Sequence, residues 1–114
     1  MAAGRSMTQE VMAMAIAEVS IVPVGTGSPS VSEYVAGAVG VLREAEGITY
    51  ELTPMGTVIE GDLDTLLATI KKMHETPFGM GVFRVVTTVK IDDRRDRPVT
   101  GQSKIESVKQ RLGE

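Results

Sequence analysis

Hydrophobic and polar positions alternate in four short stretches of the chain, the pattern typical of half-buried β-strands. The first stretch has one wholly apolar face, and its other face carries Glu18 and Ser20. Pro23 falls at the end of this stretch, where a strand tolerates proline. The second and third stretches flank Pro54-Met55-Gly56, which predicts a hairpin. The four predicted strands span residues 14–24, 48–53, 57–61 and 82–91.

Between the first two strands, apolar residues recur every three or four positions, which predicts an amphipathic helix. Residues 30–33 have the spacing of a capping box, so we expect this helix to begin at Ser30 or Ser32 and to continue to about Glu46. It contains two glycines whose expected role is close packing against a sheet: Gly37 and Gly40.

Two further helices are predicted. One begins at Asp62 or Asp64, and Pro77 and the glycines after it are expected to end it. The other is a short amphipathic helix over residues 103–112, with three apolar residues expected to face inward: Ile105, Val108 and Leu112.

The element order β-α-β-β-α-β-α predicts an α+β fold, because its first six elements form the ferredoxin-like βαββαβ sandwich. In that architecture two helices cover one face of a four-stranded antiparallel sheet, and the C-terminal helix is an addition. We expect a single domain over residues 14–112, preceded by a flexible tail over residues 1–13.

One face of this sheet has no helix to cover it. The uncovered face is expected to mix Ile, Val and Thr with Glu18 and Arg84. That face is too apolar for water and too charged for an ordinary core, which favours association with another subunit, as a homodimer or homotetramer. The alternative is a small domain that exposes some valines.

Composition narrows the functional classes. The 114 residues carry a net charge of -3, and with two Tyr, two Phe and no Trp they do not favour a nucleic-acid-binding surface. The absence of Cys excludes disulfides and thiolate chemistry, and fits a cytoplasmic protein. A single His does not favour a multi-histidine metal site, and no apolar run approaches the roughly 20 residues that span a bilayer.

Two charged residues in strands are candidates for ligand contact. Glu60, beside a glycine at a strand end, is suited to accept hydrogen bonds from an amino-bearing ligand. It is equally suited to pair with Arg84 or to cap the following helix. Arg84 can grip a phosphate or carboxylate, but a structural pair with Glu18 or Glu60 across the sheet is the favoured interpretation.

Three other segments have a weaker chemical signal. Residues 25–28 precede a helix, where their backbone N–H groups could cradle an anion, but a flexible connection is the favoured interpretation. His74 is a conceivable general base, although a histidine near a helix C-terminus more often interacts with the helix dipole. The loop with Arg94 and Arg95 is interpreted as solvated and internally paired. No set of nucleophile, base and orienting group is visible, so an enzyme is not expected.

Taken together, several segments resemble the MTH1187/YkoF-like thiamine-binding family, also grouped as UPF0045 or DUF77. The resemblance covers about residues 14–112 and rests on the order and spacing of several motifs. These are residues 18–26, 57–61, His74-Glu75, Arg84-Val85 with Thr87, 93–96 and 104–108.

The resemblance implies a ferredoxin-like protomer that assembles into dimers or tetramers and binds thiamine or its hydroxymethylpyrimidine part without catalysis and without a cofactor. It suggests a site near a subunit interface, where small ligands often bind. Glu60 would suit an aminopyrimidine, and Tyr50 could stack on the ring if the hairpin turns it toward the site. By this resemblance the site candidates are Pro23, Gly25, Thr26, Tyr50, Thr57, Glu60 and Arg84. The alternative function is a structural or regulatory assembly module without a small-molecule ligand.

Overall fold

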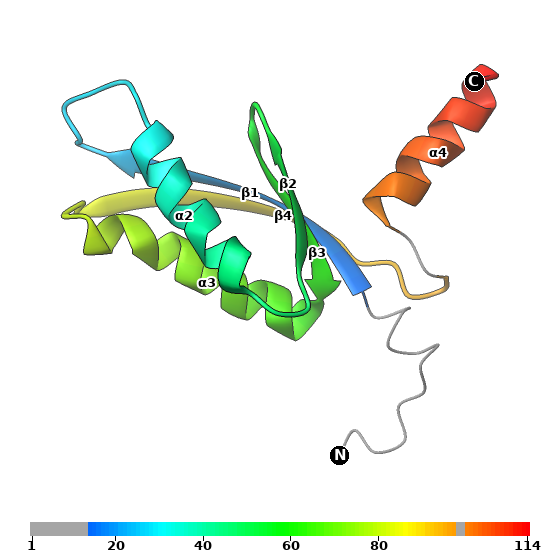
Figure 1. Ribbon diagram of the computed structural model, residues 1–114, viewed down its shortest axis with the longest axis horizontal. Coiled ribbons are helices and arrows are strands. Elements are labelled where there is room, and N and C mark those ends of the chain that lie inside the picture. The colour runs from blue at the N-terminus through cyan, green and yellow to red at the C-terminus, as the bar shows by residue number, and fades with distance from the viewer. Residues whose placement is uncertain (1–13, 98–99) are drawn as a thin grey trace, which may run out of the picture.

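Four antiparallel strands form one sheet in the order β2-β3-β1-β4 (Figure 1). The computed structural model describes residues 14–97 and 100–114, so the predicted tail over residues 1–13 lies outside the described residues. The strands are β1 (Met14–Val24), β2 (Thr49–Thr53), β3 (Gly56–Asp62) and β4 (Arg84–Asp92). The helices are α2 (Ser32–Glu44), α3 (Leu63–Gly79) and α4 (Gly101–Leu112). This order and topology confirm the predicted α+β, ferredoxin-like sandwich with an additional C-terminal helix.

The register of the central strand decides which residues face the helices. Ala17 of β1 lies opposite Ile59 of β3 and Ile91 of β4. Because side chains alternate along a strand, the residues in register with Ala17 or two positions from it share the helix side of the sheet. The other side, which we call the open face, carries residues such as Glu18 and Lys90, which lie opposite one another.

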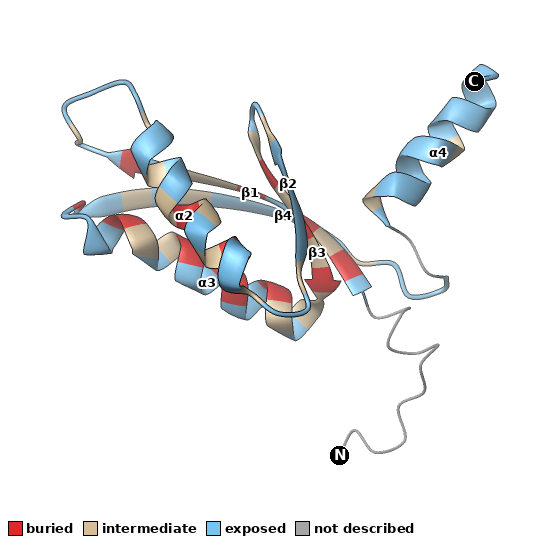
Figure 2. Ribbon diagram, viewed as in Figure 1, coloured by how far each residue is buried: buried red, intermediate tan, exposed pale blue. Residues whose placement is uncertain are grey.

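α2 and α3 lie together on the helix side, and the core lies between them and β1 and β3 (Figures 1 and 2). The buried residues of this core are Ala15, Ala17, Val19, Ala38, Leu42, Ile59, Leu66, Ile70 and Met73. Small side chains on β1 allow the helices to approach the sheet closely, so that larger residues from α2 and α3 fill the remaining space.

The predicted capping box at the start of α2 is wrong. Val31 is the N-cap, and no side chain caps this helix. The serines bond within the loop instead: Ser28 Oγ accepts from the Ser30 backbone N–H at 3.2 Å, and Ser30 Oγ lies 3.5 Å from Ser32 Oγ. A hydroxyl engaged in the loop is not free to accept from the first turn of the helix.

The two glycines of α2 do not pack against the sheet as expected. A Cβ on Gly37 would lie 3.3 Å from Met80 Sδ, at the end of α3, so this glycine lies close to the other helix. A Cβ on Gly40 would meet nothing within 4 Å. Gly40 therefore lowers helix propensity without a packing role.

α3 begins as predicted and ends at the first of the predicted glycines, but Pro77 does not interrupt it. Asp62 is its N-cap and accepts a hydrogen bond from the Thr65 backbone N–H at 3.0 Å. Pro77 lies inside the helix, which continues to Gly79. Proline has no N–H for the carbonyl four residues earlier, and here the Thr76 hydroxyl donates to that carbonyl, of Met73, at 2.8 Å. This substitute bond lets the last turn form.

The expected inward face of α4 is wrong. Ile105, Val108 and Leu112 are 49%, 58% and 69% exposed, and no residue of α4 is buried. The helix projects beyond the sheet rather than packing on the core (Figures 1 and 2). It begins at Gly101, two residues earlier than predicted, because Thr100 and Ser103 form a reciprocal capping box.

Candidate functional site

A cavity of about 200 Å³ opens on the helix side of the sheet, between the β2–β3 hairpin, the middle of β1 and the start of α2. We call it the hairpin cavity. Its walls are mostly apolar, and they include Val19, Val35, Ala38, Leu52, Thr57 and Met73. An apolar pocket with a small number of polar groups is the usual form of a small-molecule site.

Thr57 supplies a polar group to the hairpin cavity. It lies opposite Val19 in β1 and Leu52 in β2, and it is only 5% exposed. Its hydroxyl makes no hydrogen bond within residues 14–97 and 100–114. A hydroxyl can both donate and accept, so this group is available to a ligand in the cavity.

Three of the predicted site residues meet elsewhere, at the end of β1. Gly25, Thr26 and Arg84 line a second hollow of about 330 Å³, together with Tyr34 and Phe83. The Arg84 guanidinium has no ion pair or hydrogen bond with any described residue. This end of the sheet therefore presents an exposed cation beside a glycine-rich loop.

Pro23, just before this hollow, and Thr26 and Gly25, which line it, all have structural roles. Pro23 is buried and lies opposite Val85 in the sheet. The Thr26 hydroxyl donates to the Ser28 carbonyl at 3.0 Å, which closes the loop on itself. Gly25 has a φ of 83°, a conformation that side-chain-bearing residues rarely adopt. The turn after β1 therefore explains why this residue is a glycine.

Glu60 lies at the other end of the sheet. It faces Ile16 of β1, whereas Arg84 faces Val24, eight residues further along the same strand. At about 3.3 Å per residue this separation is roughly 26 Å. Glu18, opposite Lys90, is six residues from Val24, or roughly 20 Å. The predicted ion pairs of Arg84 with Glu60 or Glu18 are therefore wrong.

The Glu60 carboxylate has a different partner. Its Oε1 accepts a hydrogen bond from the Gly101 backbone N–H at 2.7 Å, at the start of α4. The predicted role as a cap of the following helix is also wrong, because Asp62 occupies that position in α3. The carboxylate instead meets the N-terminus of a helix forty-one residues away, where a negative charge is favourable.

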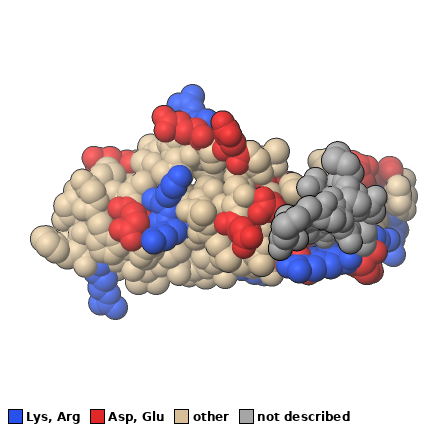
Figure 3. All heavy atoms as spheres, turned by 90° about the horizontal axis from the view of Figure 1, so that it is seen from below, with Lys and Arg blue, Asp and Glu red and all other residues tan. Residues whose placement is uncertain are grey.

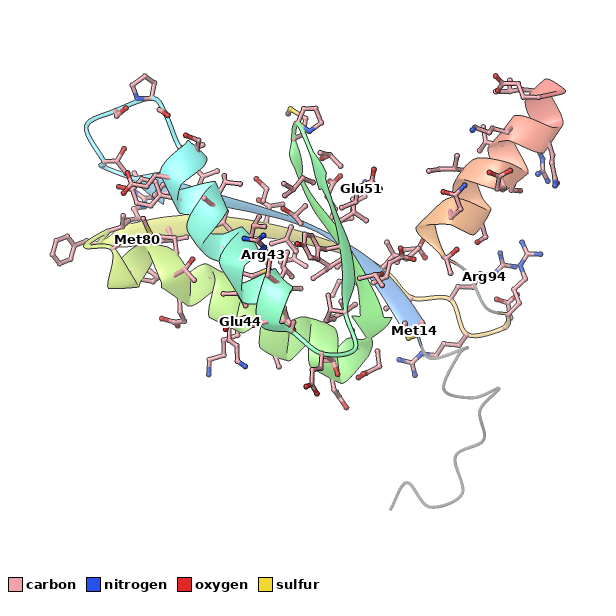
Figure 4. The ribbon with its side chains drawn as sticks, viewed as in Figure 1. Met14, Arg43, Glu44, Glu51, Met80 and Arg94 are labelled. Carbon is pink, nitrogen blue, oxygen red and sulfur yellow. The ribbon has the colours of Figure 1, made fainter. Side chains whose placement is uncertain are left out.

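Tyr50 and Glu60 lie on opposite faces of the sheet. Tyr50 is opposite Ile59, so it shares the helix side, whereas its neighbour Glu51 is on the open face. Figure 4 shows Glu51 projecting from the hairpin on the side away from α2. A ring held by Glu60 could not stack on Tyr50 in the same protomer. The sequence prediction could not resolve this because it depended on strand register.

His74 has a packing role between α3 and β4. Its Nδ1 lies 2.7 Å from the Thr87 hydroxyl, and its ring contacts Phe78 edge-on at 5.6 Å between centroids. Because α3 continues to Gly79, His74 is not at the helix end, contrary to the interpretation as a partner of the helix dipole.

The charged loop after β4 is paired within itself, as predicted. Arg95 hydrogen-bonds Asp93, and Arg94 hydrogen-bonds Asp96. These guanidinium groups hold the pKa of each aspartate carboxyl below its ordinary value. All four side chains are at or near the surface, so solvent screens the pairs.

Charge elsewhere is mixed in sign. On the face seen in Figure 3, acidic and basic side chains are interspersed. Among the described residues, no group of three or more His, Cys, Asp or Glu side chains is placed to hold a metal ion. Within the same residues, no helix combines the length and apolar character needed to cross a bilayer.

Two features of the site were not predicted from sequence. One is the hairpin cavity, whose walls come from five separate elements. The other is the contact between Glu60 and Gly101. The spacing of Thr100 and Ser103 does signal a helix start, but no local pattern indicates which carboxylate lies beside it.

Comparison with known proteins gives a family and several relatives. The family model described as thiamine-binding protein matches residues 17–109. The chain is 55% identical over 102 residues to the UPF0045 protein YqgV of Bacillus subtilis, covering 87% of this chain and 98% of the relative. It is 45% identical over 100 residues to a UPF0045 protein of Methanothermobacter thermautotrophicus, covering 87% of this chain and all (100%) of that relative.

A solved structure agrees with the fold. The crystal structure of the hypothetical protein MJ1052 from Methanocaldococcus jannaschii matches with a TM-score of 0.78 and 41% identity. The match covers 86% of this chain and 98% of that one. Since the family model spans most of the chain and these relatives align along nearly their whole length, the chain belongs to the thiamine-binding protein family.

Proposed function

We propose that this protein binds thiamine or its hydroxymethylpyrimidine part, without catalysis, at a site near a subunit interface. The observation that carries the proposal is the match of the thiamine-binding family model to residues 17–109. In this proposal the protein is a cytoplasmic homo-oligomer, and its ligand is a small molecule rather than a nucleic acid or a membrane.

The hairpin cavity supports the proposal by its size and lining. At about 200 Å³ it is smaller than the roughly 300–1,000 Å³ of pockets that enclose a drug-sized ligand. A single substituted pyrimidine ring suits that volume better than the two rings of thiamine. In the proposal the pyrimidine enters the cavity, with the Thr57 hydroxyl as its hydrogen-bond partner.

The rim of the cavity supports a site near an interface. Leu52 and Met55, on the hairpin, are 55% and 84% exposed. Apolar side chains at the mouth of a small cavity would be covered by a second protomer, which would also complete the walls around the rest of the ligand. Thr57 lies opposite Val19, five residues or roughly 17 Å along β1 from Val24, the residue opposite Arg84. Arg84 is also on the open face, whereas the cavity is on the helix side, so in this proposal Arg84 does not contact the pyrimidine.

The absence of catalysis is part of the proposal. His74 is hydrogen-bonded to Thr87, and the hairpin cavity has no ionisable side chain among its lining residues. General acid–base chemistry needs a titratable group within hydrogen-bond reach of the reacting atom.

The alternative is an assembly module without a ligand. The exposed apolar residues of the open face and of α4 favour it, because they are suited to bury surface against another chain. In that case the hairpin cavity is a packing defect rather than a site.

A thermal-shift titration distinguishes the two functions. The ligands are thiamine, thiamine phosphates and hydroxymethylpyrimidine, with the oligomeric mass measured in the same buffer. A ligand that binds only the folded state raises the melting temperature with its concentration. A saturable rise with any of these compounds supports the proposal. An unchanged melting temperature up to millimolar ligand, from a stable oligomer, would leave the assembly module as the function.

A further inference from the structure

α4 carries an apolar stripe with nothing packed against it. Ile105, Val108 and Leu112 recur at spacings of three and four residues, so they lie along one side of the helix. All three are about half exposed or more. A helix with no buried residue gains nothing from the core of its own protomer, although its sequence is amphipathic.

The base of α4 is nevertheless fixed to the open face. Gly101 donates to the Glu60 carboxylate at 2.7 Å, and Lys104 forms an ion pair with Asp92 at the end of β4. From this base the helix extends past the end of the sheet (Figure 1). The two contacts set the direction in which the stripe is presented.

The open face of the sheet is a second uncovered surface. Val22 and Val24 of β1 and Val86 of β4 are 45%, 39% and 47% exposed there. The strand register also aligns a row across the sheet in which Val58 lies between two carboxylates, Glu18 on β1 and Glu51 on β2. Neither carboxylate has a hydrogen-bond or ion-pair partner within the described part of the chain.

The charges of the two surfaces are complementary. At 100° per residue, the stripe of α4 is flanked by three cations, Lys104, Lys109 and Arg111. Lys104 is paired with Asp92 of its own protomer, so the cations that can meet a second copy are Lys109 and Arg111. The corresponding row on the sheet runs Glu51, Val58, Glu18 and Lys90, so Val58 lies between two carboxylates and Lys90 follows at the edge strand. Lengths also agree, because a twelve-residue helix is about 18 Å long and four strands are about 14 Å wide.

We propose that α4 of each protomer lies across the open face of a second copy of this chain, with its stripe on Val58 and its cations beside Glu18 and Glu51. Both surfaces belong to the same chain. A two-fold dimer therefore covers the stripe and the open face of both protomers, and it leaves no free copy of either surface for further assembly. A different partner protein would cover one surface and leave the other exposed. The inference rests on the self-association in the proposed function, and it does not depend on the ligand.

Paired aspartate variants test the contact. Val108→Asp places a charge in the stripe, and Gln110→Asp places the same charge on the opposite side of α4. We expect sedimentation equilibrium to show at least tenfold weaker self-association for V108D and no change for Q110D. Circular dichroism of the dissociated protomers should give the same melting temperature for the two variants and the wild-type chain. A monomeric wild-type chain, or equal association of the two variants, would overturn the proposal.

A cross-linking test does not depend on how a destabilising charge affects folding. The chain has no cysteine, so each single-cysteine variant has one thiol. Val108→Cys protein is mixed with Val58→Cys protein of different mass and then oxidised. The proposal predicts a disulfide-linked heterodimer from this mixture and little from Gln110→Cys with Val58→Cys. Equal yields from both mixtures would contradict it.

The ligand is tested separately in the same preparations. The hairpin cavity lies on the helix side of the sheet and the α4 contact on the open face. Normal association with no thermal shift by thiamine or hydroxymethylpyrimidine would remove the ligand proposal and keep the α4 contact. A thermal shift together with equal cross-linking in both mixtures would keep the ligand proposal and remove the α4 contact.

Discussion

The Glu60 carboxylate accepts a hydrogen bond from the Gly101 backbone N–H at 2.7 Å, and so joins β3 to the first turn of α4. The contact is close enough that a Cβ on Gly101 would lie 3.4 Å from Glu60 Oε2. It places a negative charge at the N-terminus of a helix that has no buried residue. The position of α4 therefore depends on this bond and on its few polar neighbours.

Glu60→Gln is expected to loosen α4 while leaving the core intact. A hydrogen bond to a charged acceptor contributes about 1.5–3 kcal/mol, and the neutral amide retains only part of that. We expect the Gly101 amide to exchange with deuterium about tenfold faster, without a change in the amides of β1. Glu51→Gln, a carboxylate on the same face with no partner among the described residues, is the control. Unchanged exchange at Gly101 would mean that the bond does not hold the helix.

Asp62→Ala is expected to destabilise the fold by about 1 kcal/mol. Its side chain accepts from the Thr65 backbone N–H at 3.0 Å and from the Thr65 hydroxyl at 2.6 Å, which satisfies the first turn of α3. Urea unfolding followed by circular dichroism measures the change. Asp64→Ala, in the same turn but exposed, should lower the free energy of unfolding by less. Equal losses would indicate that only the charge matters.

Two glycine substitutions are expected to have opposite signs. In Gly61→Ala the new Cβ would lie 2.7 Å from Ile48 Cδ1 and 2.8 Å from the Gly47 carbonyl oxygen, which belongs to the backbone. We expect a loss of about 1–3 kcal/mol, as for other overpacked sites. Gly40→Ala meets nothing within 4 Å and should stabilise α2 by up to about 1 kcal/mol. Denaturant midpoints measure both, and stabilisation by Gly61→Ala would be inconsistent with the observed packing of β3.

Thr57→Val is expected to weaken ligand binding at least tenfold and to leave the fold unchanged. The substitution keeps the shape of the side chain and removes the hydroxyl of a residue that lines the hairpin cavity. A site that hydrogen-bonds its ligand loses selectivity for that ligand when the protein's hydrogen-bonding group is removed. Isothermal titration with hydroxymethylpyrimidine measures the affinity, and Thr88→Val on the open face is the control. Equal affinity in both variants would place the pyrimidine elsewhere.

Asp93 is expected to titrate below the ordinary range. The Arg95 hydrogen bond lowers the carboxyl pKa in the folded state, so the pair stabilises the fold above the unfolded pKa. That contribution is lost as the pH falls through the folded pKa, and it is small because the pair is exposed. An NMR titration of the carboxyl groups should give a higher pKa for Asp93 in the Arg95→Gln variant than in the wild-type chain. A pKa that does not move would show that Arg95 is not its partner in solution.

Local periodicity was sufficient to predict the fold. The alternation at Ala15, Ala17 and Val19 predicted β1 and its buried face, because a two-residue period is a property of a strand itself. The order of elements then predicted the ferredoxin-like topology and the uncovered face. The family resemblance, carried by segments spread along the chain, agreed with the family match over residues 17–109.

The assignments that failed depended on contacts that periodicity does not show. Ser28 and Ser30 bond within the loop before α2 instead of capping it, and the Thr76 hydroxyl bonds the Met73 carbonyl that Pro77 cannot reach, so α3 continues past Pro77. Ile105 and its stripe were expected to face inward because an amphipathic pattern predicts a buried side but does not identify the surface that covers it.

The sequence by itself determined which residues are apolar, their period and therefore the elements and their order. Only the tertiary structure decided that Glu60 meets Gly101 rather than Arg84, and that Tyr50 and Glu60 lie on opposite faces. The physical reason is register: a shift of one residue between strands turns every side chain to the other face, and several residues of offset separate charges by tens of ångströms. Hydrophobic pattern is local, whereas the distance between two side chains depends on how the whole sheet is paired.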